Sequence, residues 1–220
     1  MKNWILPALL IVSCSVACNL ANKSGSQSAP ASGVTKTDSR NIVGFTKIKA
    51  ENAIELSVAV TNGYSIVIKG DESVLPSVVT ELQGDTLVIS LKDKTVSRSR
   101  INVSVTLPEL SALELIGATH ATVKGVKSDE LKVAATGASS AEIEGQTRDL
   151  KINAIGASSV NAEGLKADKA DVEAVGASKI TVSVSDELKA DATGASSVTY
   201  TGEPKSLKQN TSDVSTINKK

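Results

Sequence analysis

Residues 137–156 read Gly-Ala-Ser-Ser-Ala-Glu-Ile-Glu-Gly-Gln-Thr-Arg-Asp-Leu-Lys-Ile-Asn-Ala-Ile-Gly, and the final glycine begins the next copy of the same pattern. The phrase Gly-Ala-Ser, or once Gly-Ala-Thr, occurs five times at spacings of 20, 19, 20 and 18 residues. A repeat of this length is typical of stacked coils, because one such unit cannot bury its apolar side alone. The phrases begin at Gly117, Gly137, Gly156, Gly176 and Gly194.

Apolar and polar residues alternate on both sides of each phrase. Leu150, Ile152 and Ala154 precede one glycine at every second position, with Lys151 and Asn153 between them. Alternation of period two indicates strands with one buried face, so each coil is predicted to contain at least two short strands. Stacking then places like residues in columns, such as Val133, Ile152, Val172 and Ala190, or Ala141, Val160, Ile180 and Val198.

Each coil is predicted to have two corners. The Gly-Ala-Ser corner combines a glycine that permits a tight bend with a hydroxyl that can bond to local backbone. The other corner is polar and variable, as in 126–129 and 146–149. Parallel strands joined this way favour a right-handed parallel β-helix with coils of about 18–20 residues. The structural turn residues are the five glycines above with Ser139, Ser158, Ser178 and Ser196.

The repeats contain no convincing catalytic or metal-binding pattern. A serine nucleophile needs one serine with a histidine and an acid, whereas here the serine recurs and His120 is the single histidine. Turn formation explains the recurring Asp129, Asp149, Asp168 and Asp186 better than a metal ladder does. No catalytic residue, metal or cofactor is therefore predicted, although Arg148 together with Asp129, Asp149 and Asp168 in a concave groove would keep an enzyme possible.

Residues 1–17 are predicted to be a lipoprotein signal peptide. An apolar run follows Lys2 and is too short to span a bilayer, and small residues precede a cysteine. Ser15-Val16-Ala17-Cys18 resembles a bacterial lipobox, so Cys18 is the predicted lipidated residue, with Cys14 as the alternative. Both cysteines of the chain lie here, so the domain is expected to have no disulfide.

Four further segments follow from composition and pattern. Residues 18–39 are small and polar, as in a flexible tether. Residues 40–108 alternate like strands without the repeat and are expected to begin or cap the solenoid. Within them, Asn62-Gly63 predicts a hairpin. Residues 109–206 form the repeating coils, and 207–220 are expected to be a C-terminal tail.

The order of several segments resembles the putative auto-transporter adhesin, head GIN domain family. These segments are Gly44-Phe45-Thr46-Lys47-Ile48, the strand from Tyr64 to Lys69 that runs into Gly70-Asp71-Glu72, Asp85-Thr86-Leu87-Val88-Ile89, Val103-Ser104-Val105-Thr106-Leu107-Pro108 and the Gly-Ala-Ser coils. The resemblance covers roughly residues 40–205. It implies a right-handed β-helix in an exported or lipid-anchored envelope protein, and the family name implies adhesion without assigning binding residues.

A non-catalytic cell-envelope lipoprotein with an adhesin-like role is therefore the leading functional hypothesis. Its partners would be the membrane, through the lipid anchor, and an unidentified protein or glycan, contacted by outward residues such as Glu142, Asn161, Thr181 and Thr199. The balance of 24 basic against 24 acidic residues disfavours nucleic acid. The alternatives are a periplasmic structural or signalling lipoprotein and a polysaccharide-active β-helix enzyme. Outer-membrane attachment is expected, with the face unresolved.

Overall fold

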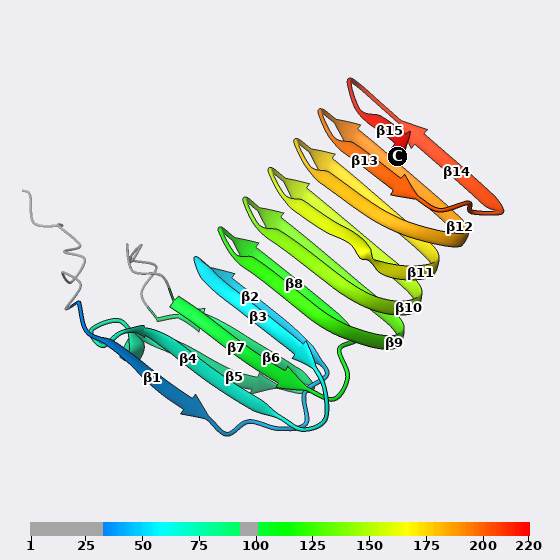
Figure 1. The fold of residues 1–220 in the computed structure, drawn as a ribbon. Coiled ribbons are helices and arrows are strands. Elements are labelled where there is room, and N and C mark those ends of the chain that lie inside the picture. The colour runs from blue at the N-terminus through cyan, green and yellow to red at the C-terminus, as the bar shows by residue number, and fades with distance from the viewer. Residues whose placement is uncertain (1–32, 93–100) are drawn as a thin grey trace, which may run out of the picture.

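In the repeating segment, long strands stack one after another, each running from one Gly-Ala-Ser turn to the next (Figure 1). A computed structural model describes residues 33–92 and 101–220. Adjacent coils pair in parallel from one glycine to the next, which defines a β-solenoid. The long strands are β9 (His120–Gly137), β10 (Ser140–Gly156), β11 (Ser159–Gly176) and β12 (Lys179–Gly194).

The predicted second corner is a bend inside a continuous strand, so each coil has one long strand where at least two short strands were predicted. Parallel pairing resumes on both sides of the bend after register shifts, for example between Ile143 and Gly145. The bend forms a third side of the coil, where Val126, Leu165 and Val184 point inward and are buried. Burial of these side chains favours continuous pairing over an exposed loop.

The predicted core columns are confirmed. Ile152 pairs with Val133 on one side and with Val172 on the other, and Val172 pairs with Ala190. The second column is equally in register, and all its members are buried. Apolar side chains from every coil thus stack into one core that runs along the solenoid.

The N-terminal part both extends and caps this stack. Its strands are β1 (Thr35–Arg40), β2 (Lys47–Asn52), β3 (Ile54–Val60), β4 (Ser65–Asp71), β5 (Val78–Gln83), β6 (Thr86–Leu91), β7 (Ile101–Leu107) and β8 (Ala112–Gly117), with a 3₁₀ turn at Leu75–Ser77. One side of the solenoid runs β1-β4-β7-β3-β9, and the other runs β5-β6-β2-β8-β9. The coil of β2 and β3 therefore lies between β6–β7 and β8–β9, out of chain order.

The hairpin predicted at Asn62-Gly63 was wrong. The chain turns there, with Gly63 at a φ of +96°, but β7 lies between β3 and β4. β3 pairs with β7 in parallel, which places Leu56 beside the buried Val103. Insertion of β7 thus gives β3 an apolar parallel partner and leaves β4 as an antiparallel strand near the end of the stack.

Both segments expected to be irregular contain strands. β1 begins within the predicted tether 18–39 and pairs with β4, from Thr35 opposite Asp71. In the predicted tail 207–220, β14 (Ser206–Thr211) pairs with β12, and β15 (Thr216–Lys219) pairs with β13, the strand Ser197–Thr201. The tail therefore adds a coil, because the previous coil offers it open backbone hydrogen-bonding groups.

Candidate functional site

The glycines of the repeat form a column along one edge of the solenoid. Each has positive φ, between +84° and +93°. A Cβ atom on Gly156 would lie 2.8 Å from the carbonyl oxygen of Gly137, so the backbone of the preceding coil leaves no room for a side chain there. These corners therefore require glycine both for conformation and for close stacking.

Two residues that sequence reasoning missed continue this column. Asn52 pairs with Gly117 at one end, and the amide of Gly194 donates to the Asp213 carboxylate at the other. Both have positive φ, which asparagine and aspartate tolerate better than most residues. Asp213-Val214-Ser215 was the detectable signal, because it is a degenerate copy of Gly-Ala-Ser.

The predicted turn serines are buried. Ser158 is 1% exposed, and its hydroxyl donates to Ile155 O at 2.7 Å and to Ala135 O of the preceding coil at 3.0 Å. Ser178 bonds to Val175 O and Gly156 O, and Ser196 bonds to Ala174 O. These hydroxyls bridge a turn to the coil before it, and their burial keeps them from reaching a ligand.

The run that follows each Gly-Ala-Ser phrase presents an outer surface that we call the hydroxyl face. Ser, Thr and Asn dominate two neighbouring columns there. The first column contains Ser104, Ser57, Thr122, Glu142, Asn161, Thr181, Thr199 and Asn218. The second contains Asn102, Glu55, His120, Ser140, Ser159, Lys179, Ser197 and Thr216. The four outward residues predicted to form an interaction surface therefore lie in one column.

His120 is half exposed within the hydroxyl face. Its Nδ1 lies 2.6 Å from Ser140 Oγ, and its Nε2 lies 4.0 Å from Glu55 Oε1. The three residues come from adjacent coils of one column. Within residues 33–92 and 101–220, no three His, Cys, Asp or Glu side chains are grouped closely enough to hold a metal ion.

The run that precedes each glycine presents a charged face on the opposite side. Lys132, Lys151, Asp171, Lys189 and Lys208 form one of its columns. Glu130 accepts from Lys151 at 2.8 Å and lies 3.3 Å from Lys132, and these hydrogen bonds lower the pKa of its carboxyl. Opposite charges are thus paired across coils, which leaves little charge free for a ligand.

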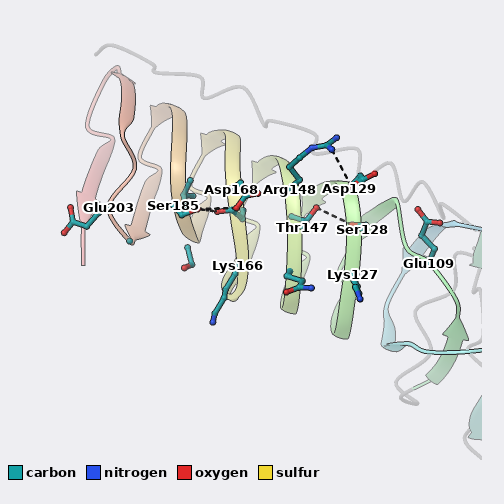
Figure 2. Close-up of a pocket in the computed structure, with 15 residues that line it drawn as sticks. Glu109, Lys127, Ser128, Asp129, Thr147, Arg148, Lys166, Asp168, Ser185 and Glu203 are labelled. Carbon is teal, nitrogen blue, oxygen red and sulfur yellow. Dashed lines mark hydrogen bonds and ion pairs between the residues drawn. The ribbon is translucent and has the colours of Figure 1, made fainter.

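A shallow groove of about 1040 Å³ runs along the third side of the coils. Asp129, Arg148 and Asp168, three of the four residues singled out in the sequence, line this groove (Figure 2). Arg148 lies 3.6 Å from Asp129, and its Nε donates to the fourth residue, Asp149, at 2.9 Å. These two contacts raise the pKa of Arg148, with the bond to Asp149 as the larger cause. Arg148 is therefore ion-paired with Asp129 and Asp149, whereas Asp168 lines the same groove without an ion pair among the described residues.

Cys14, Cys18, the predicted signal peptide and most of the predicted tether lie outside the described residues. In the part of the chain that is described, no helix has the length and apolar character needed to cross a membrane.

The chain is therefore a β-solenoid protein with ladder-like outer faces and a buried row of turn hydroxyls. The family model described as putative auto-transporter adhesin, head GIN domain matches residues 44–204, and the chain belongs to this family. Membership confirms the resemblance seen in the sequence.

Solved structures share this fold. A putative adhesin from Bacteroides fragilis has a TM-score of 0.70 and 18% identity, covering 86% of this chain and 99% of its own. A putative adhesin from Parabacteroides merdae has a TM-score of 0.57 and 20% identity, covering 86% and 98%. No curated protein matches this chain. The solved structures support the fold, and the family description supports an adhesin-like class of function for an exported envelope protein.

Proposed function

We propose that this protein is a lipid-anchored envelope protein that makes adhesive contacts through its hydroxyl face. The supporting observation is the arrangement of short, mostly uncharged polar side chains in register along the solenoid, such as Asn161, Thr181 and Thr199. Short side chains lose little rotamer entropy on binding, and hydroxyls cost less to desolvate than charges. A flat array of this kind suits weak, multivalent contact with a polar surface.

An adhesin would lie on the outer side of the outer membrane, whereas a periplasmic structural or signalling lipoprotein would lie on the inner side. Protease accessibility therefore distinguishes the two. Protease is added to intact cells, and loss of this protein is compared with that of a known periplasmic protein. An adhesin is degraded while the control survives, and a periplasmic protein survives until the outer membrane is breached. Cleavage of the purified protein by the same protease is the required control.

The hydroxyl face is tested by replacing Thr181 and Thr199 together with lysine in the full chain. Both side chains are partly exposed, so the variant is expected to fold and to lose adhesion of expressing cells to immobilised glycans and proteins. The matched control is Lys151→Thr and Lys189→Thr on the charged face. Equal adhesion of the two variants would show that the hydroxyl face is not the contact surface.

The lipid anchor is proposed at Cys18, with Cys14 as the alternative. Metabolic labelling with a radioactive fatty acid is expected to mark the parent chain and Cys14→Ala but not Cys18→Ala. Labelling of Cys18→Ala together with loss of label in Cys14→Ala would assign the anchor to Cys14. Absence of label in the parent would mean that the chain is not lipidated.

One observation keeps the polysaccharide-active enzyme as a second candidate, namely that Asp129 and Asp168 line one groove. A pair of carboxylates in one groove is the set of groups that glycosidases use. Formation of new reducing ends from purified polysaccharides, abolished by Asp129→Asn and Asp168→Asn, would establish this activity. Absence of product with the parent protein would leave the adhesin-like role.

A further inference from the structure

The groove on the third side follows the solenoid axis across several coils. Its floor contains Ser128 and Thr147, whose hydroxyl oxygens lie 3.3 Å apart, followed by Ala167 and Val184. Strands cross the groove rather than run along it, so a ligand lying along the axis would be contacted by side chains, one coil after another (Figure 2). A linear polymer with a regular repeat fits such a row.

One wall of the groove is a row of hydrogen-bond donors. Lys127, Gln146, Lys166 and Ser183 occupy matching positions of four coils and are in register. Within residues 33–92 and 101–220, their side chains form no hydrogen bond or ion pair. The donors of this wall are therefore available to acceptors of a ligand.

The opposite wall contains acidic side chains that already contact other residues of the protein. Asp129 is paired with Arg148, and Asp168 lies 3.4 Å from the hydroxyl of Ser185. Lys127 and Lys166 extend to one side of the groove, whereas Asp129 and Arg148 extend to the other (Figure 2). The positive wall is thus separated from the acidic wall across the groove.

We propose that this groove binds a linear acidic polysaccharide that carries about one carboxylate per disaccharide. Lys127 and Lys166 are two coils apart, or about 10 Å at the usual strand spacing, which is close to the length of a disaccharide. Each ammonium binds one carboxylate, and Gln146 donates to the hydroxyls of the intervening sugar. Four acids line the groove (Glu109, Asp129, Asp168 and Glu203) against three cations (Lys127, Arg148 and Lys166), so a polymer with a charge on every sugar is disfavoured.

This binding site is separate from the hydroxyl face and is tested directly with the full chain. Titration calorimetry at low salt compares three soluble probes of equal length. A hyaluronan oligosaccharide carries one carboxylate per disaccharide, an oligogalacturonate carries one per sugar, and a chitin oligosaccharide is neutral. We expect hyaluronan to bind most tightly, with affinity that falls as salt is added.

The variant Lys127→Gln with Lys166→Gln is expected to weaken hyaluronan binding at least about tenfold, because two charge-assisted hydrogen bonds are lost. Lys208→Gln is the matched control, because Lys208 is an exposed lysine outside the groove that has no partner among the described residues. Lys151→Thr with Lys189→Thr, which removes two lysines of the charged face, should leave hyaluronan binding unchanged, which separates binding in the groove from general charge attraction. Tighter binding of either other probe, no binding of hyaluronan, or an equal loss in the Lys208 control would overturn the proposal.

Discussion

The carbonyl oxygen of Gly137 lies 2.8 Å from the position that a Cβ atom would occupy on Gly156 in the next coil. The same relationship recurs at Gly176 and Gly194, each against the glycine one coil earlier. The backbones of adjacent coils are therefore in direct contact along the turn column. A side chain added at one of these glycines would clash with the coil before it as well as strain its own turn.

Gly156→Ala is expected to destabilise the protein by about 2–4 kcal/mol, because alanine must adopt a φ of +91° and also meets the Gly137 carbonyl. Thermal and urea unfolding measure the loss. Gly63→Ala is the matched control, because Gly63 has a φ of +96° but nothing within 4 Å of its added Cβ. Similar losses at both positions would mean that backbone strain alone matters and that the close stacking does not.

Ser158→Ala is expected to cost about 1–3 kcal/mol of unfolding free energy, because buried carbonyls of two coils lose a donor. Ser159→Ala is the neighbouring control. Its side chain is partly exposed and makes no hydrogen bond among the described residues. A Ser158→Ala midpoint in urea equal to that of the control would contradict the bridging role of the hydroxyl.

Val172→Asp is expected to destabilise the fold by several kcal/mol, since it puts an unpaired carboxylate between Ile152 and Ala190 in the core column. Circular dichroism during heating measures the change. Val175→Asp makes the same substitution at a partly exposed position of the same strand and should have little effect. A melting temperature of Val172→Asp within a degree of the parent would refute the register.

The charged face predicts a pH dependence of stability. The pKa of Glu130 is lowered in the folded protein by hydrogen bonds from Lys151 and Lys132. Its contribution is therefore present above the carboxyl pKa of the unfolded chain and is lost as pH falls through the lower folded value. Glu130→Gln is expected to reduce the fall in melting temperature between about pH 5 and about pH 3 at low salt.

The control for this titration is Glu142→Gln on the hydroxyl face, because Glu142 forms no ion pair among the described residues. It should leave the slope of melting temperature against pH unchanged. A parent protein whose melting temperature falls as steeply as that of Glu130→Gln would show that the ion pairs of the charged face are too solvated to affect stability.

The sequence by itself determined the period of the coils, their turn glycines and the residues of the core columns. Each coil repeats one local pattern, and stacking places Val133, Ile152 and Val172 together whenever the glycines are aligned. The same alignment also places Lys127 and Lys166 in one row. That this row lines a groove could not be predicted from the strand pattern.

Only the tertiary structure decided the order of the N-terminal strands and the place of Asn52 in the turn column. Local alternation predicts a buried face on β3 but does not determine which strand pairs with it, and β3 pairs with the distant β7 instead of forming a hairpin with β4. Asn52 extends the glycine column because the neighbouring coil holds its backbone at positive φ, a constraint that acts through pairing rather than through local sequence.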